Sequence, residues 1–424
     1  MTFAELGLSP NIQQALDKLN YSTPTPIQAQ AIPTILQGCD VLAAAQTGTG
    51  KTAAFTLPLA EIFHQQAQQT LKPNHCRALI LTPTRELAAQ VFESVTLYSQ
   101  FTDLSIVQVF GGVSINPQMK NMRRGCDILV ATPGRLLDLH SKNAVRFDQV
   151  QMFVLDEADR MLDMGFIHDI KRIIKLLPNK RQNLLFSATF SNSIRSLAQE
   201  IVTNPVEISV APANTTAAQI EHSVVQVEKA KKSKLLSHLI QTNNWEQVLV
   251  FTRTKSGANR LVKQLSGREI SAAAIHGNKS QGARNKALQG FKDKEVRVLV
   301  ATDIVARGID IQELPHVINY DLPHVAEDYV HRIGRTGRAG QSGEAVSFVT
   351  ADDLEQLGDI QNTIQKMIPV LDVPGYSLKK PLPELALKPV KAKKPKKPKK
   401  PKKPKTFNLE LGGRKKAKKP INRP

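Results

Sequence analysis

The sequence predicts an α/β protein with two consecutive domains, each a parallel sheet flanked by helices, and a separate basic C-terminal tail. Three observations lead to this fold class. Short apolar runs alternate with helix-compatible segments, which is typical of buried parallel strands. At 424 residues the chain exceeds one ordinary core. Lysine and proline then dominate the last part of the chain, where no apolar pattern continues.

The charge is concentrated in that tail. Residues 379–424 contain 19 Lys or Arg and 2 acidic residues, a net charge of +17, which leaves +3 for the rest of the chain. Repulsion and proline, as in residues 393–405, exclude a packed core there, so residues 373–424 are predicted to be disordered. Such a segment is either an electrostatic tether for nucleic acid phosphates or a solubilising end. We favour the tether, because the motifs below also indicate nucleic acid.

Several protein classes are excluded. No apolar run approaches the roughly 20 residues of a membrane span, and the first residues do not have the pattern of a signal peptide. The three cysteines, Cys39, Cys76 and Cys126, lack metal-ligand spacing. We therefore expect a cytoplasmic protein that has no membrane contact, disulfide or zinc site.

A proline-punctuated stretch, Tyr21 to Gln28, opens the first domain and continues into a helical segment. The Gln28 amide offers both a donor and an acceptor to an adenine edge, and Phe3 could stack on the same base. The alternative for Gln28 is an ordinary residue of a helix N-terminus.

A phosphate-binding turn follows the first apolar strand, residues 41–44. Its residues are Ala45, Gln46, Thr47, Gly48, Thr49, Gly50, Lys51 and Thr52. Glycines let backbone N–H groups approach phosphate oxygens, and the following helix adds its N-terminal dipole. Lys51 can reach the β- and γ-phosphates, and the Thr52 hydroxyl can ligate Mg²⁺. The sequence thus predicts binding of a nucleoside triphosphate.

Polar clusters follow the other apolar runs of the first domain, where parallel α/β sheets bind ligands. The expected strands lie within 78–81, 106–110, 128–131, 152–155 and 184–186. Asp156 comes directly after one of them, where a second acidic residue of a P-loop protein approaches Mg²⁺. Glu157 could orient or deprotonate an attacking water. The alternative for this acidic pair is a charge effect at a helix N-terminus.

The second domain repeats the pattern without a phosphate-binding turn. Residues 203–218 lack periodicity and are predicted to form the linker; further strands are expected within 248–251, 271–275, 296–300, 317–320 and 345–349. The segment His331–Arg338 contains three arginines. Arg335 and Arg338 are expected on one side of a helix, from which they would reach a γ-phosphate held by the first domain. The alternative is a basic surface turn.

Taken in order, these motifs resemble those of DEAD-box ATP-dependent RNA helicases of superfamily 2. The resemblance covers Phe3 and residues 21–28, 45–52, 83–88, 111–112, 132–135, 156–159, 187–189, 248–254, 301–310 and 331–338. Ala45, where a P-loop usually begins with glycine, is this family's own form; Asn20 departs from its usual glycine. The core is most similar to the bacterial RhlE subfamily, whose basic tails are alike in kind.

The resemblance implies two RecA-like domains, ATP and Mg²⁺ as cofactors, RNA as partner and roles for particular residues. Catalysis would fall to Lys51, Asp156, Glu157, Arg335 and Arg338. ATP would be bound by Phe3, Tyr21, Gln28 and residues 45–52, and Asp310 would approach the nucleotide ribose. RNA contacts would fall on Pro83, Thr84, Arg85, Gly112, Thr132, Pro133, Gly134, Arg135, Arg253 and Thr302. Ser187, Thr189, Asp159 and His331 would couple the domains. Ribosomal particles or RNA-decay proteins are expected partners, and ribosome biogenesis an expected process.

The predicted boundaries are an ATP-binding domain over 1–207, a linker over 208–218, a second helicase domain over 219–372 and the tail over 373–424. Three activities are compatible with these features: an RNA-dependent ATPase that separates short duplexes, an ATP-gated RNA clamp or annealer that uses the tail, and a DNA translocase. The segments 21–28 and 156–159 favour RNA over DNA.

Overall fold

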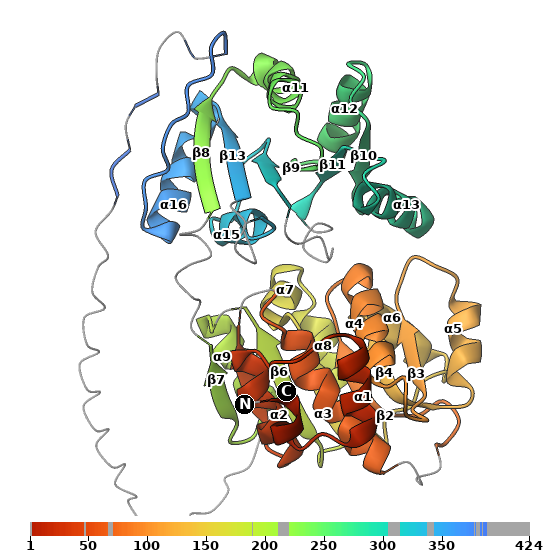
Figure 1. Cartoon of the computed structure of the whole chain (residues 1–424). Coiled ribbons are helices and arrows are strands. Elements are labelled where there is room, and N and C mark those ends of the chain that lie inside the picture. Colours follow the sequence, from red (N-terminus) through yellow and green to blue (C-terminus); the bar gives the residue numbers. More distant parts are fainter. Residues whose placement is uncertain are drawn as a thin grey trace, which may run out of the picture. The chain divides into compact units, whose positions relative to one another are not determined.

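The computed structural model describes residues 2–45, 48–66, 71–188, 190–210, 220–303, 314–336, 343–376, 378, 382–383 and 385–387. Two parallel sheets with helices on both faces form its framework, which confirms the predicted fold class (Figure 1). No helix among these residues is both long and apolar enough to cross a bilayer.

The N-terminal sheet has the strand order β3-β4-β2-β5-β6-β1-β7 in the described part of the chain, and every pairing is parallel. Its strands are β1 (Val41–Ala44), β2 (Cys76–Leu81), β3 (Ile106–Val109), β4 (Cys126–Ala131), β5 (Met152–Leu155), β6 (Gln182–Ser187) and β7 (Val206–Ser209). Its helices are η1 (Phe3–Leu6), α1 (Pro10–Lys18), α2 (Pro26–Leu36), α3 (Lys51–Gln65), α4 (Arg85–Tyr98), α5 (Ile115–Met122), α6 (Pro133–Ser141), α7 (Ala158–Asp163), α8 (Ile167–Ile174) and α9 (Asn192–Ile201).

Alternation of side chains along each strand divides the N-terminal core into two layers. In β1, Val41 and Ala43 pack on the face that α2, α3 and α4 cover, whereas Leu42 packs on the face that α5 to α9 cover. Both faces are apolar because helices bury both, which explains why these strands read as continuous apolar runs in the sequence.

β7 corrects the linker prediction. Residues 203–218 were expected to lack regular structure, yet Val206–Ser209 pair in parallel with β1 at the edge of the sheet. Three of the four residues of this strand are exposed, so the segment carries no apolar run. The prediction failed because an edge strand is defined by its partner strand rather than by its own hydrophobicity.

The C-terminal sheet has the order β10-β11-β9-β12-β13-β8 in the described residues, again entirely parallel. Its strands are β8 (Ile220–Gln226), β9 (Val248–Phe251), β10 (Ala272–Ile275), β11 (Val298–Ala301), β12 (His316–Asn319) and β13 (Gly343–Val349). Its helices are η2 (Lys229–Lys231), α11 (Lys232–Thr242), α12 (Lys255–Ser266), α13 (Gln281–Lys292), α15 (Glu327–Ile333), η3 (Ala351–Asp353) and α16 (Leu354–Ile364). Helices α11 and α12 cover one face, and α13, α15 and α16 cover the other.

Candidate ATP and nucleic acid site

The phosphate-binding turn leaves the carboxyl end of β1 and leads into α3. Gly48 and Gly50 have positive φ angles of 81° and 90°, which glycine adopts without strain. A Cβ atom at Gly50 would overlap Nε2 of Gln28, so the packing also requires glycine there. Lys51 is buried, and its Nζ donates a hydrogen bond of 2.6 Å to the Ala45 carbonyl. The turn therefore holds its lysine close to its own backbone.

Gln28 lies under this turn, at the N-terminus of α2. Its Oε1 accepts a hydrogen bond from the Thr25 backbone N–H at 2.9 Å, and its Nε2 donates to the Gly50 carbonyl at 3.2 Å. The helix N-terminus interpretation is thus confirmed, since Gln28 takes part in a capping box of α2. Because the same amide also contacts the turn, its role toward adenine stays a prediction.

The two aromatic residues among the predicted ATP-binding positions differ in exposure. Phe3 is only 5% exposed and belongs to an apolar cluster with Ile32 and Leu57. Tyr21 is 43% exposed, with its ring centroid 6.2 Å from that of Tyr98. Tyr21 therefore offers far more ring surface to a base than Phe3 does.

Asp156 and Glu157 follow β5, and both carboxyls lie near enough to Lys51 of the phosphate-binding turn for its charge to act on them. Asp156 is 2% exposed, and its Oδ1 accepts a hydrogen bond of 2.9 Å from the Glu157 N–H. Glu157 has a left-handed backbone, with φ of 50°, which is uncommon outside glycine. Burial first, and then the Glu157 charge, raise the pKa of Asp156 to about 7, although Lys51 opposes the shift. Burial also raises the pKa of Glu157, against the charges of Lys51, Arg160 and Arg335.

This buried acidic pair fits a divalent cation. Two adjacent carboxyls in a desolvated place repel each other when ionised, and oxygen ligands are those that Mg²⁺ prefers. Asp156 and the Thr52 hydroxyl are the groups that would hold the ion, in part through water. Within the described residues no cluster of three His, Cys, Asp or Glu side chains forms a separate metal site.

Asp156→Asn is expected to stabilise the nucleotide-free protein above neutral pH. A raised folded-state pKa means that the native state holds its proton more tightly than the unfolded chain, so ionisation lowers stability as pH rises from about 4 to about 7. Asparagine removes this loss, which is of the order of 1 to 4 kcal/mol. Melting curves from pH 4 to 8.5 should show a gain over wild type that grows with pH. The exposed Asp103→Asn should show none, and a gain independent of pH would contradict the assignment.

The predicted coupling residues connect the loops after β5, β6 and β1. Asp159 Oδ2 accepts a hydrogen bond of 3.1 Å from the Ala188 N–H, directly after β6. The carbonyl of Ser187 accepts one of 3.1 Å from the Ala45 N–H at the start of the phosphate-binding turn. Two hydrogen bonds thus connect the three loops, and the coupling role of these residues stays a prediction.

The arginine-rich segment departs from the expectation. Arg335 was expected on a helix, but α15 ends at Ile333 and Arg335 lies just beyond it. Gly334 is the C-cap residue of this helix, and its backbone N–H donates to the Arg332 and Val330 carbonyls. Arg335 is 5% exposed, and its charge lowers the pKa of Glu157, so it acts electrostatically on that carboxyl. His331 lies on α15 itself.

The predicted RNA contacts of the N-terminal domain follow β2, β3 and β4, which are neighbours in the sheet. Thr84 caps α4, with its Oγ1 accepting from the Leu87 N–H at 3.2 Å. The Arg85 guanidinium lies against Gly112, whose φ is 75°. Arg135 donates to the Val113 carbonyl at 2.8 Å. The other predicted residues are Pro83, before α4, and Thr132, Pro133 and Gly134 at the start of α6.

Gly112→Ala is expected to weaken RNA binding by about tenfold, as judged by the RNA concentration that half-maximally stimulates ATP hydrolysis. A Cβ atom there would overlap the Arg85 guanidinium, and alanine is also strained at this φ. Displacing one charge-assisted contact costs roughly 1.5–3 kcal/mol. Gly282→Ala is the matched control, because an added Cβ there meets nothing within 4 Å. An unchanged half-saturation would show that Arg85 does not contact RNA.

The C-terminal candidates also follow neighbouring strands. Arg253 comes after β9 and Thr302 after β11, and the order β10-β11-β9 places them at one end of the sheet. Arg253 lines a polar cavity of about 540 Å³, together with Thr254, Lys255, Ser256, Asn259, His276 and Asn278. His276 is 2% exposed and bonds Asn259 through Nε2 at 3.1 Å.

Two contacts between the domains went unpredicted. Arg160 Nη1 lies 3.1 Å from Asp328 Oδ1, with both side chains below 10% exposure. Glu86 Oε1 lies 2.5 Å from Arg284 Nη2 and accepts a hydrogen bond from Gln281 at 3.1 Å. Gln281 and Arg284 are three positions apart in the sequence, but no local signal indicates their partner Glu86, more than 190 positions away. Five predicted site residues, namely Gln46, Thr47, Thr189, Asp310 and Arg338, lie outside the described residues, as do most of the linker and tail.

Comparison with known proteins identifies the family. The chain matches the DEAD/DEAH box helicase model over residues 25–197 and the helicase conserved C-terminal domain model over residues 230–340. It is 43% identical over 389 residues to ATP-dependent RNA helicase RhlB of Pseudomonas aeruginosa, covering 90% of this chain and 97% of the relative. RNA helicase CrhR of Synechocystis is 42% identical over 377 residues, covering 89% and 75%.

A solved structure agrees. The S. cerevisiae Dbp5 structure bound to RNA and ADP BeF3 matches with a TM-score of 0.76 and 32% identity, covering 87% of this chain and 95% of that one. The structural match covers most of the chain that forms the two parallel sheets. The protein belongs to the DEAD-box family of superfamily 2 RNA helicases, which are ATP-hydrolysing enzymes.

Proposed function

We propose that this protein hydrolyses ATP in response to RNA and uses the cycle to separate short RNA duplexes locally. One observation supports this most strongly. In the N-terminal sheet the nucleotide candidates follow β5, β6 and β1, which are neighbours, and the RNA candidates follow β3, β4 and β2, which are also neighbours. The carboxyl ends of the strands in one sheet thus carry both candidate sites, each in its own half. An RNA strand bound at one half can therefore influence the nucleotide bound at the other.

The chemistry is assigned to residues of both domains. Lys51 binds the β- and γ-phosphates, and Arg335 neutralises charge that develops on the γ-phosphoryl group. A Glu157 oxygen accepts the proton of the attacking water. Mg²⁺, when bound, would neutralise charge on the phosphate oxygens. Arg160–Asp328 and Glu86–Arg284 are buried ion pairs through which nucleotide and RNA binding stabilise the joined domains.

RNA recognition is expected to be mostly independent of sequence. The candidate groups are guanidinium, hydroxyl and backbone groups, which contact phosphates and 2′-hydroxyls rather than base edges. The cavity beside Arg253 has the same character, since Lys255 and several neutral polar side chains line it. We therefore expect RNA binding to depend little on the base sequence.

Steady-state ATP hydrolysis is the decisive measurement, with no nucleic acid, with single-stranded RNA and with DNA of the same sequence. Selective stimulation by RNA supports the proposal. Equal rates in all three conditions would contradict it, and equal stimulation by DNA would favour a DNA translocase instead.

The tail supports a second candidate, an ATP-gated RNA clamp or annealer. Its net charge of +17 would neutralise phosphates and thereby speed strand pairing. Deleting residues 379–424 is expected to slow annealing of complementary RNA strands at least tenfold while ATP hydrolysis by the core changes less than twofold. An annealing rate unaffected by the deletion would exclude the tail from this activity.

The assignments of subfamily, location and protein partners rest on the composition of the chain and on its family resemblance. The RhlE-like subfamily, a cytoplasmic location, and partners among ribosomal particles or RNA-decay proteins remain predictions. Co-sedimentation of the protein with ribosomal particles from its own cells, compared with the chain lacking residues 379–424, would test the first kind of partner.

A further inference from the structure

A buried lysine begins α11 in the C-terminal domain. Lys232 has a side chain that is 5% exposed, and its Nζ donates to the Tyr320 carbonyl at 2.9 Å and to the Phe348 carbonyl at 3.2 Å. The carboxylates of Asp353 and Asp321 lie 3.5 and 3.8 Å away. A cation is unfavourable at a helix N-terminus and costly to bury. Its position is therefore set by these partners rather than by the helix.

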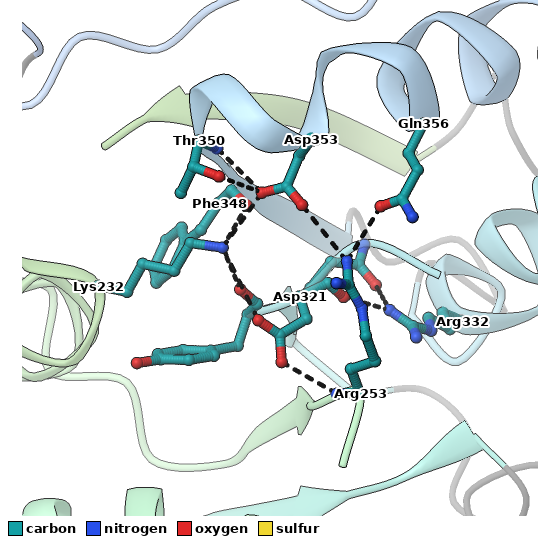
Figure 2. A network of polar contacts seen from close by, with 10 residues as sticks. Lys232, Arg253, Asp321, Arg332, Phe348, Thr350, Asp353 and Gln356 are labelled. Carbon is teal, nitrogen blue, oxygen red and sulfur yellow. Dashed lines mark hydrogen bonds and ion pairs between the residues drawn. The ribbon is translucent and has the colours of Figure 1, made fainter. Parts of the chain in front are cut away.

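Asp353 is held in place from several sides (Figure 2). Its Oδ2 accepts hydrogen bonds from the Thr350 N–H at 3.0 Å and the Thr350 hydroxyl at 2.7 Å, and faces Lys232. Burial opposes ionisation, but the Thr350 bonds and the Lys232 charge hold the pKa of Asp353 below its usual value. The carboxylate is thus ionised and fixed, with its second oxygen directed at Arg253.

Arg253 contacts this second oxygen, Asp353 Oδ1. Its Nη2 donates to Asp353 Oδ1 at 3.3 Å and to Gln356 Oε1 at 3.0 Å, and its backbone N–H donates to Asp321 Oδ2 at 3.0 Å. Both of these side-chain bonds use Nη2, and the side chain is 35% exposed. Arg253 is also one of the residues that line the cavity of about 540 Å³, together with Lys255 and His276.

Asp321 extends the cluster toward the arginine-rich segment. Its carbonyl accepts a hydrogen bond of 2.6 Å from Arg332 Nη1. The same guanidinium is bidentate to Asp303, at 2.6 and 2.7 Å, next to Thr302. Figure 2 shows Arg253, Asp321 and Arg332 converging from the ends of different elements. The cluster therefore connects the loops after β9, β11 and β12 with α15.

We propose that Lys232, Asp321, Asp353 and Gln356 form a positioning network that holds the Arg253 guanidinium toward an RNA phosphate. None of the four contacts RNA; they act through Arg253. This inference rests on the proposed function, because it takes Arg253 as an RNA contact. Pre-organising a flexible arginine removes the cost of ordering it on binding, so the network strengthens RNA binding rather than turnover.

Asp353→Asn in the full-length protein tests the network, since it keeps the shape and removes the charge. The RNA concentration for half-maximal ATP hydrolysis should rise about tenfold, with kcat at saturating RNA and the RNA-free rate each changing less than twofold. Loss of one phosphate contact should also reduce the slope of log affinity against log salt by about 0.7. A substitution that only disturbed the fold would not change the half-saturating RNA concentration and the salt dependence while leaving kcat and the RNA-free rate unchanged. The exposed Asp359→Asn on α16 is the matched control and should behave as wild type.

A double-mutant cycle with Arg253→Ala separates the network from an independent role. If Asp353 acts through Arg253, adding Asp353→Asn to Arg253→Ala should have no further effect on half-saturation. Additive effects would overturn the proposal, and so would tighter RNA binding by Asp353→Asn, which would mean that Asp353 competes with RNA for the arginine.

Two further results keep the outcome clear. If Asp353→Asn melts below the assay temperature, Gln356→Ala is the deciding variant, because it removes one hydrogen bond to Arg253 Nη2 without leaving a buried charge unpaired. A rise of about threefold in the RNA concentration for half-maximal ATP hydrolysis supports the network. An unchanged value overturns the proposal. If Arg253→Ala leaves RNA binding unchanged while RNA still stimulates wild-type ATP hydrolysis, the network proposal fails and the proposed function stands. If RNA does not stimulate the wild type, the proposed function itself fails.

Discussion

Arg335→Ala is expected to lower the rate of ATP hydrolysis at saturating RNA by about 10³-fold or more, the effect typical of an arginine that stabilises γ-phosphoryl transfer. The side chain is almost fully buried beyond the end of α15, and its charge already acts on Glu157. Because this charge matters most in the transition state, ATP affinity should change only a few-fold.

Single-turnover hydrolysis and binding of a fluorescent ATP analogue together check this expectation. Arg335→Lys keeps the charge but loses the planar fork, so we expect a loss close to that of alanine. The exposed Arg260→Ala, which removes a charge from the same domain, should be neutral. A loss below tenfold in Arg335→Ala would place this arginine outside the reaction.

Glu157→Gln is expected to reduce ATP hydrolysis by about 10² to 10⁴-fold while ATP binding is retained. Glutamine has nearly the same shape, so the left-handed turn and the hydrogen bond from its N–H to Asp156 should persist, whereas the carboxylate that accepts a proton is lost. An enzyme that binds ATP but cannot hydrolyse it should also release RNA more slowly.

ATP hydrolysis and the lifetime of the RNA complex in ATP are the two measurements. Glu200→Gln serves as control, since that side chain is 47% exposed and pairs with Lys171 at the surface. If hydrolysis survived in Glu157→Gln, another residue would have to be the base. If hydrolysis and ATP binding were lost together, the residue would act in binding.

The sequence predicted the parts of the site that depend on local spacing. The run Gly48-Thr49-Gly50-Lys51-Thr52 specifies turn, lysine and hydroxyl within one loop, and the structure forms it between β1 and α3. Asp156 follows an apolar strand, and its burial and raised pKa agree with a position beside that loop. Such features are visible in a sequence because strand, turn and helix are consecutive.

Predictions failed where an element depended on a distant partner. β7 has no apolar run of its own and exists because β1 offers an open edge. The helix expected around Arg335 ends at Ile333. The Arg335 carbonyl instead accepts a hydrogen bond of 3.1 Å from the backbone N–H of Leu314, a distant segment.

The sequence by itself determined the fold class, the phosphate-binding turn and the identity of most residues at the strand ends, because each follows from short-range periodicity and spacing. Only the tertiary structure decided how those ends are grouped. The order β3-β4-β2-β5-β6-β1 separates the RNA candidates from the nucleotide candidates, and the order β10-β11-β9 gathers Arg253, His276 and Thr302. Strand order is set by crossovers and by packing between distant segments, and so are the buried pairs of Lys232 with Asp353 and Glu86 with Arg284. Neither the strand order nor these buried pairs can be read from periodicity and spacing along the sequence.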